Sequence, residues 1–360
     1  GLAKAMELRL IDQARLNRLL DAADPDEISR ILGECGYPAG KNPEEILAAE
    51  LNASLVWLRQ IMPDPDYGAT LIAFHDGHNL KLVLKKLLTL WITEAGNEQT
   101  NGQQPVPVVR GQDTAEKSGL PEFGGLNGIP PFGRTAAQTL GPSQVDPDFL
   151  YHEIAEHRSG NLPEWLFSAA VSAVKRYMAH YDLSVVDTWL DQVTWDRSHQ
   201  LAARTGNLFL IGWLRRKTDL INLELLLRAR TLRIGPEILK NTLLPNGSIP
   251  ARQVLDLYGA SEESIADAYA KTPYAALADL CRIYAEQGQA GRFGLLADNL
   301  LMQHVRTASR IVSGPEVPLA WVLARQSEIK NVRIILTCLR NAVPKTQVRE
   351  LIRDSYLAWR

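Results

Sequence analysis

The sequence has few aromatic residues, and it carries no surplus of charge of either sign. Only 7% of the 360 residues are aromatic, whereas Leu, Ala and the charged helix formers are plentiful. That balance favours helices over sheets. The formal net charge is -2 with both signs interspersed, so no basic surplus is available to neutralise a phosphate backbone. The composition predicts an all-α protein without a nucleic-acid partner.

Cysteines are also scarce, and long apolar runs are missing. The three cysteines are odd in number, far apart and never in a C-x-x-C pair: Cys35, Cys281 and Cys338. This argues against a disulfide framework and a thiolate metal site, and it suits a reducing cytoplasm. The longest apolar run, 208–214, is far shorter than the roughly 18 to 20 residues that cross a bilayer. No direct membrane span is expected.

The N-terminal residues 1–6 give no targeting signal. They have neither the apolar segment of a signal peptide nor an obvious initiator Met, and we assign them no function. Beyond them, apolar residues recur at helical spacing. Within 7–32, Asp24 supplies a cap and Pro25 a first-turn proline for a second helix. The segment therefore predicts a helical hairpin. Further helices are expected at roughly 43–62, 68–94, 147–158 and 163–181, then continuously over 183–233.

Residues 96–146 differ from the rest of the chain. They are rich in Gly, Pro, Gln and Asn and show no lasting period. We expect a Gly/Pro-rich loop or linker here. A loop of this length inside a compact domain is usually functional or mobile, and the sequence does not decide between these two possibilities.

An internal repeat is the most informative feature of the sequence. It begins with an acidic residue, two variable residues and an Asn. An apolar residue, a polar residue and three apolar residues then follow. This pattern occurs three times, at Asp76 and Asn79, at Asp219 and Asn222, and at Glu328 and Asn331. On a helix, residues three apart lie on one face, so the carboxylate and the amide can form one hydrogen-bonding unit. The pattern predicts a structural packing device.

The energetic consequence of this device can be stated for its second copy. A buried Asn can satisfy a polar group of a neighbouring helix and fix how two helices pack. If Asn222 bonds such a buried partner, Asn222→Leu is expected to destabilise the chain by about 1 to 3 kcal/mol.

A second element recurs in the same order. Tyr37 lies nine residues after Ile28, and Tyr274 lies nine residues after Ile265. This element marks the start of a new unit, which indicates three related helical units. The predicted organisation is unit 1 over 1–95, the loop over 96–146, unit 2 over 147–234 and unit 3 over 235–360.

The repeat also carries a resemblance to a known family. Its three copies, together with the segments 5–10 and 244–250, resemble the C-subunit family of V/A-type rotary ATPases, whose vacuolar relative is the d subunit. The likeness covers most of the chain and suggests a bacterial member. It implies three similar helical domains that form a funnel with pseudo-threefold symmetry. The loop at 96–146 departs from the shorter link expected in the family.

The resemblance implies a mechanical function. The chain would be a non-catalytic central-stalk subunit with no active site and no cofactor, coupling the rotor-shaft subunits of the catalytic head to the membrane proteolipid ring. It would serve ATP-driven transport or ATP synthesis, with proton or sodium as the ion, from the cytoplasmic face of the cell membrane. Close-packed helices suit this work because they transmit strain well. The transported ion, the ring stoichiometry and the contacting residues stay open.

Two sequence patterns suggest metal chemistry. His152 and His157 resemble a zinc-protease signature, but five helical residues leave the two rings roughly 140° apart, so they would not meet on one ion. His75, Asp76 and His78 suggest a metal-dependent helical hydrolase, which needs further ligands from a chain with only seven histidines. Metal binding is therefore not expected. The hydrolase and a free-standing helical scaffold remain the alternatives.

One glycine-rich and one basic segment also suggest binding functions. The glycine-rich stretch 124–133 lacks the Gly-Lys-Ser/Thr of a phosphate-binding loop. The basic cluster Arg215, Arg216 and Lys217 is a possible interface with an acidic shaft end. A solvated helix end, where cations meet the C-terminal dipole, explains it equally well.

Overall fold

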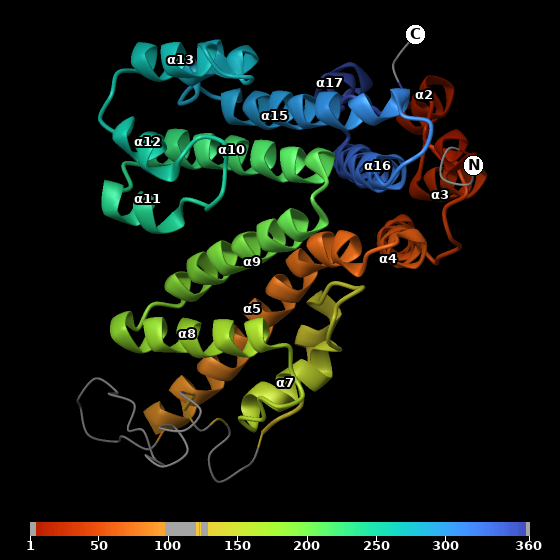
Figure 1. Cartoon of the computed structure of the whole chain (residues 1–360). Coiled ribbons are helices and arrows are strands. Elements are labelled where there is room, and N and C mark those ends of the chain that lie inside the picture. The colour runs from red at the N-terminus through yellow and green to blue at the C-terminus, as the bar shows by residue number, and fades with distance from the viewer. Residues whose placement is uncertain (1–4, 98–119, 122, 124–128, 358–360) are drawn as a thin grey trace. The chain divides into compact units, whose positions relative to one another are not determined.

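The computed structural model describes residues 5–97, 120, 121, 123 and 129–357, and these residues form helices without any strand (Figure 1). The all-α prediction is therefore confirmed. The described residues divide into two compact units, one made of 1–68 with 202–360 and the other of 69–201. In the part of the chain that the structure describes, no helix combines the length and the apolar character needed to cross a membrane.

The unit of residues 69–201 contains most of α5 (Pro65–Asn97) and α9 (Leu183–Thr205), together with η3 (Gly133–Gln138), α7 (Pro147–Ala155) and α8 (Glu164–His180). Its core joins apolar side chains of these helices to residues from the segment between α5 and α7. Leu120, Phe123 and Phe132 of that segment are all buried. Parts of the predicted 96–146 loop thus belong to the core, while residues 98–119, 122 and 124–128 lie outside the described residues.

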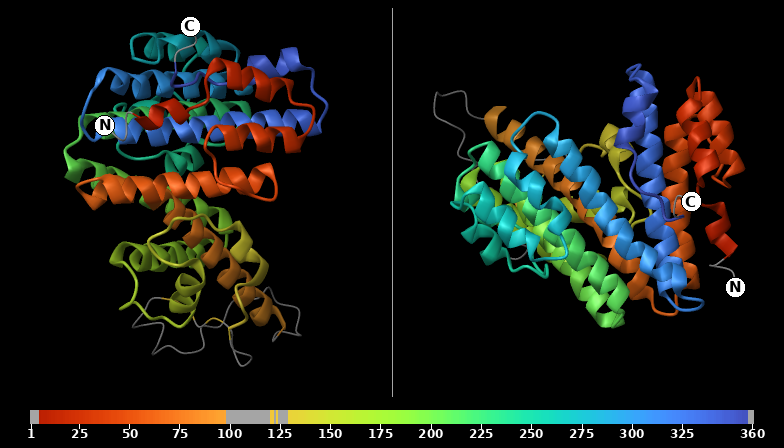
Figure 2. Two further views of the ribbon diagram at one scale, coloured as in Figure 1. Left: turned by 90° about the vertical axis from the view of Figure 1, so that its right-hand side faces the viewer. Right: turned by 90° about the horizontal axis from the view of Figure 1, so that it is seen from above.

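The other unit contains two helical clusters, each around one long helix. In the first, α16 (Glu316–Arg340) packs along α4 (Pro43–Ile61), and Figure 2 shows the blue α16 beside the orange α4. This cluster is completed by η1 (Glu7–Arg9), α2 (Gln13–Asp21), α3 (Pro25–Glu34) and α17 (Lys345–Leu351). One hydrophobic core contains side chains from both ends of the chain, including Ile28 and Leu336.

The second cluster is built on α10 (Leu208–Thr231), which packs against α15 (Gln289–Arg306). The shorter elements around this pair are α11 (Pro236–Thr242), α12 (Ala251–Asp256), α13 (Glu262–Ala270), η4 (Ala275–Leu277), α14 (Ala278–Ile283) and η5 (Thr307–Arg310). Figure 1 shows α10 and α15 running side by side. Their core includes Leu223, Leu227 and Phe293.

Local sequence signals explain the N-terminal hairpin. The Asp24 side chain accepts a hydrogen bond from Glu27 N at 2.8 Å, and the Glu27 carboxylate accepts one from Ala23 N at 2.9 Å. The two bonds satisfy one free backbone donor of the first helical turn, Glu27 N, and one just before the helix, Ala23 N, while Pro25 occupies a position that needs no donor. The predicted hairpin is confirmed as α2 and α3, which pack together.

The prediction of one continuous helix over 183–233 was wrong. α9 ends at Thr205 and α10 begins at Leu208. Gly206 adopts a left-handed backbone with φ +64°, which readily terminates a helix. Asn207 then caps α10 because its side chain accepts a hydrogen bond from Leu210 N. The Gly-Asn pair was a visible stop and start signal within an otherwise unbroken helical period.

Candidate functional site

The three Asn side chains of the repeat each hold one residue of an extended segment through two hydrogen bonds. Each amide donates to that residue's carbonyl and accepts from its N–H. Asn79 holds Leu140 in this way at 2.9 and 2.8 Å, and Asn222 holds Leu244 at the same two distances. Asn331 holds Arg353 at 3.0 and 2.9 Å. An amide thus supplies both partners that a neighbouring strand would give, which fixes the segment against the long helix.

The acidic residue of each copy binds a second backbone N–H. Asp76 Oδ1 accepts from Gln144 N at 2.7 Å, and Asp219 Oδ1 accepts from Ile249 N at 2.9 Å. Glu328 Oε1 accepts from Ile11 N at 2.5 Å, across 317 residues of sequence. We call the acid, the Asn and the segments that they hold a clamp. Clamps 1, 2 and 3 are those of α5, α10 and α16, and clamp 3 binds both ends of the chain.

A glycine makes clamp 2 possible. A methyl group at Gly247 would lie 2.3 Å from Asp219 Oδ1, far inside van der Waals contact. Asn246, just before it, has φ +66°, a left-handed conformation that Asn tolerates better than most residues. The Asn-Gly pair therefore lets the backbone turn closely around the carboxylate.

The recurring tyrosines contact the acids of the clamps. Tyr274 donates from its hydroxyl to Asp219 Oδ2 at 2.6 Å, and Tyr37 donates to Glu328 Oε2 at 3.4 Å. Tyr37 thus pairs with the acid of the third copy, although it precedes the first copy in the sequence. Because both phenols are buried beside a carboxylate, their pKa values are raised, which keeps them neutral donors.

Clamp 3 contains a buried ionic cluster. The Arg325 Nε atom lies 3.0 Å from Glu50 Oε1, and its Nη1 atom donates to Glu328 Oε2 at 2.9 Å. The guanidinium also lies 4.4 Å from the centre of the Tyr37 ring. Burial raises the pKa of Glu328 to about 7, although Arg325 and the hydrogen bonds act in the opposite direction. One guanidinium thus faces two buried carboxylates. Because it can neutralise only one negative charge, burial favours protonation of one of the two carboxylates.

The basic segment at 215–217 does not gather on one face of α10. Successive helical residues are about 100° apart, so three neighbours point in different directions. Arg215 is exposed, whereas the half-buried Arg216 borders a pocket. The ammonium of Lys217 lies 4.8 Å from the centre of the Trp213 ring, and burial lowers the pKa of Lys217 to about 8. An interface role for these residues stays a prediction.

The histidines that suggested metal chemistry contact backbone carbonyls. His75 Nδ1 lies 3.0 Å from Pro142 O, and His78 Nε2 lies 3.0 Å from Gln138 O. α7 ends before His157, whose Nε2 lies 2.8 Å from Pro121 O. No group of three or more His, Cys, Asp or Glu side chains is placed to hold a metal ion within the described residues.

The six clamp residues are those of the sequence repeat, whereas sequence reasoning missed Glu50, Arg325 and the pairing of Tyr37 with Glu328. One signal for Arg325 was available: an Arg stands three residues before the acid in two of the copies, as Arg216 and Arg325. Nothing in the local sequence marks Glu50 as the partner of an Arg so far along the chain.

Comparison with known proteins places the chain in a family. The model of the ATP synthase (C/AC39) subunit family matches residues 139–351, more than half of the chain and including clamp 2. The C subunit of the A-type ATP synthase of Thermoplasma volcanium is 26% identical over 145 residues, 40% of each chain. That of Pyrococcus furiosus is 26% identical over 139 residues, 38% of this chain and 37% of the relative. The matches thus span about two fifths of the relatives' length. By the family match, the chain belongs to the ATP synthase (C/AC39) subunit family.

Proposed function

We propose that this chain is a non-catalytic central-stalk subunit of a V/A-type rotary ATPase. It couples the rotor shaft of the catalytic head to the proteolipid ring in the membrane, for proton or sodium transport. The observation that carries this proposal is the ordered set of three clamps in a member of an ATP synthase subunit family. The two A-type relatives are named as C subunits of ATP synthases, which supports a role as an ATPase subunit.

The clamps suit a part that bears torque. Each one fixes a non-helical segment to a long helix through two hydrogen bonds of a buried Asn side chain. Buried polar groups that are fully satisfied resist displacement, because breaking them leaves donors and acceptors without water or protein partners. Closely packed helices then transmit strain with little compliance.

We also propose that the chain has no active site of its own. The acids and amides of the clamps are buried and bound to backbone groups, so their chemistry is structural. Metal analysis of the purified chain separates this proposal from a helical hydrolase. A stoichiometric bound metal would favour the hydrolase.

Three related units remain our interpretation of the repeat, with one change suggested by clamp 3. The unit built on α16 takes Arg353 from the C-terminal segment and Ile11 from the N-terminal segment. We therefore propose that 1–68 completes the third unit, whereas the sequence assigned these residues to the first. The pseudo-threefold funnel stays a prediction.

A binding experiment tests the proposed function. The purified chain is mixed separately with the rotor-shaft subunits and with the detergent-solubilised proteolipid ring of the same organism, and co-purification is measured. Binding to both is expected, at the cytoplasmic face where a peripheral subunit would meet the ring. Binding to neither by a folded chain would reject the central-stalk role and favour a free-standing scaffold.

Charge reversal tests the predicted interface on α10. Arg215→Glu is expected to weaken shaft binding by roughly tenfold or more, because an exposed rim cation would become a repelling anion. Arg228→Glu makes the same charge change at another exposed position of α10 and serves as the matched control. Equal affinities of the two variants would remove Arg215 from the interface.

A further inference from the structure

Clamps 2 and 3 are built alike but differ in their ionic partners. Each has a Tyr that bonds the acid and an Arg three residues before the acid. In clamp 3, that Arg is Arg325, which is fully buried and pairs with both Glu50 of α4 and Glu328. The equivalent residue of clamp 2 is Arg216. The two clamps therefore allow a direct comparison within one chain.

Arg216 has no acidic partner within the described residues. No ion pair of Arg216 occurs there, and its one hydrogen bond is a 3.4 Å contact from Nη1 to the carbonyl of Gly212 in its own helix. Asp219 is shorter than Glu328, and both its oxygens are engaged, by Ile249 N and by the Tyr274 hydroxyl. The acid of clamp 2 therefore does not neutralise the cation that precedes it.

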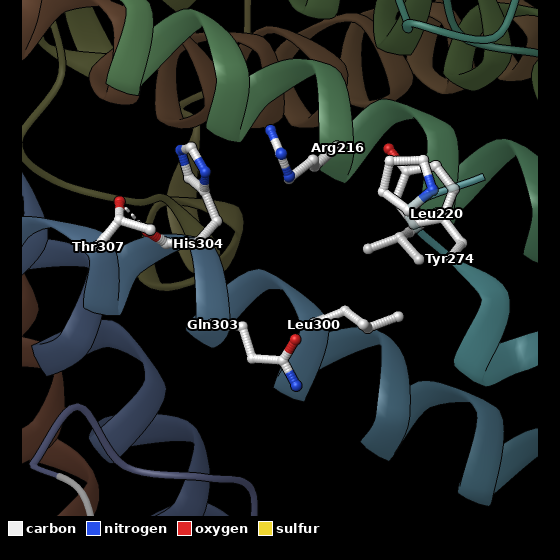
Figure 3. Close-up of a pocket in the computed structure, with 8 residues that line it drawn as sticks. Arg216, Leu220, Tyr274, Leu300, Gln303, His304 and Thr307 are labelled. Atoms are coloured by element: carbon white, nitrogen blue, oxygen red, sulfur yellow. Dashed lines mark hydrogen bonds between the residues drawn. The ribbon is translucent and has the colours of Figure 1, made fainter.

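A pocket of about 240 Å³ lies beside this cation, between α10 and α15 (Figure 3). The pocket is smaller than the roughly 300 Å³ at which drug-sized sites begin, so it suits a side chain or a small ion. Its lining includes Arg216, Tyr274, Gln303, His304 and Thr307. Gln303 and Thr307 are exposed, so the pocket opens to solvent.

The second potential cation of the pocket is His304. A methyl group at Gly212 would lie 3.2 Å from His304 Cε1 and 3.3 Å from Arg216 Nη1, so both groups approach the same point of α10. His304 Nε2 donates to Phe209 O at 2.8 Å. Burial lowers the pKa of His304, and the charge of Arg216 lowers it further. The other ionisable group that lines the pocket is Tyr274, whose proton is held by Asp219.

We propose that this pocket binds a carboxylate from outside the chain, which pairs with Arg216 as Glu50 pairs with Arg325. The carboxylate belongs either to a free small anion or to an acidic side chain of a protein partner. In both cases it neutralises a half-buried guanidinium and favours protonation of the neighbouring imidazole, because an anion stabilises a nearby cation.

The test uses the full chain labelled with ¹³C at histidine Cε1, with sodium acetate as the probe. The pKa of His304 is measured by NMR in sodium acetate and in sodium chloride of equal ionic strength, and His304→Gln identifies the signal. Acetate is expected to raise the pKa of His304 by roughly one unit. Arg216→Gln should abolish this difference between the salts, while Arg215→Gln should preserve it.

A second variant supplies the carboxylate internally. Gln303→Glu changes a pocket-lining amide into a carboxylate of the same size. It should raise the pKa of His304 in chloride alone and reduce the response to acetate. The proposal is overturned if the pKa of wild-type His304 is the same in both salts, or if the acetate effect survives Arg216→Gln.

A binding experiment with the rotor-shaft subunits then decides the source of the carboxylate. This experiment rests on the proposed function. If the pocket takes a side chain of the shaft, acetate should compete with shaft binding by the wild type and not by Arg216→Gln. If shaft binding is independent of acetate, the pocket serves a free anion. Failure of the shaft to bind at all would reject the proposed function and leave the acetate result standing.

Discussion

Asn222→Leu removes both hydrogen bonds by which clamp 2 holds the backbone of Leu244. Asn222 and Leu244 are 1% and 5% exposed, so water does not readily replace the lost partners. Each buried backbone group left unsatisfied costs about 1 to 3 kcal/mol. The higher helix propensity of Leu returns about 0.5 kcal/mol. The net loss in the free energy of unfolding is therefore about 2 to 5 kcal/mol, above the sequence-based value, because the structure gives Asn222 two partners at one residue.

The assay combines urea denaturation with amide hydrogen exchange. The variant should unfold at lower urea, and residues 244–249 should exchange faster, while residues 140–144 of clamp 1 keep their rate as an internal reference. Gln253→Leu, at an exposed position of α12, controls for the introduction of a leucine. An unchanged denaturation midpoint with unchanged exchange at 244–249 would refute the role assigned to Asn222.

Two further predictions concern the acids of clamps 2 and 3. Tyr274→Phe should destabilise the chain by about 1 to 3 kcal/mol, and by more than Tyr37→Phe does. The reason is that the Tyr274 hydroxyl bonds Asp219 at 2.6 Å, whereas the Tyr37 hydroxyl lies 3.4 Å from a Glu328 oxygen that Arg325 also binds. Equal urea midpoints of the two variants would contradict this order. The pKa of Glu328 rises from 4.5 unfolded to about 7 folded, so its contribution to stability should fall as pH rises through that window. Glu328→Gln should flatten this part of the dependence in urea midpoints measured from about pH 5 to about pH 8, and an identical pH profile would reject the shifted pKa.

Much of the secondary structure was predictable because its determinants are local. The cap at Asp24 could be recognised in the sequence and is confirmed, whereas the reciprocal bond from Ala23 N to Glu27 was found in the structure. The break at Gly206 was equally local, but the strong apolar period on both sides concealed it. The repeat located both polar residues of each clamp. It did not indicate that their partners would be backbone groups of extended segments, because such segments have no periodicity to recognise.

The partners across long sequence separations were not predictable in this way. Tyr37 lies 291 residues from Glu328, and Ile11 lies 317 residues from it. Sequence order placed Tyr37 in the same unit as the acid that follows it, Asp76. The structure instead brings the N-terminal helices to α16, because the apolar faces of α2, α3, α4 and α16 share one core.

The sequence by itself determined the all-helical class, the approximate extent of α4, α7 and α8, and the three pairs of acid and Asn, since helical period, caps and breakers act within a few residues. Only the tertiary structure decided which segments the pairs hold, which Tyr meets which acid, and why Arg325 is neutralised while Arg216 borders an open pocket. The physical reason is that burial and ion pairing depend on which distant surfaces pack together. The carboxylate of Glu50 on α4 meets Arg325 because α4 and α16, far apart in the sequence, pack into one core.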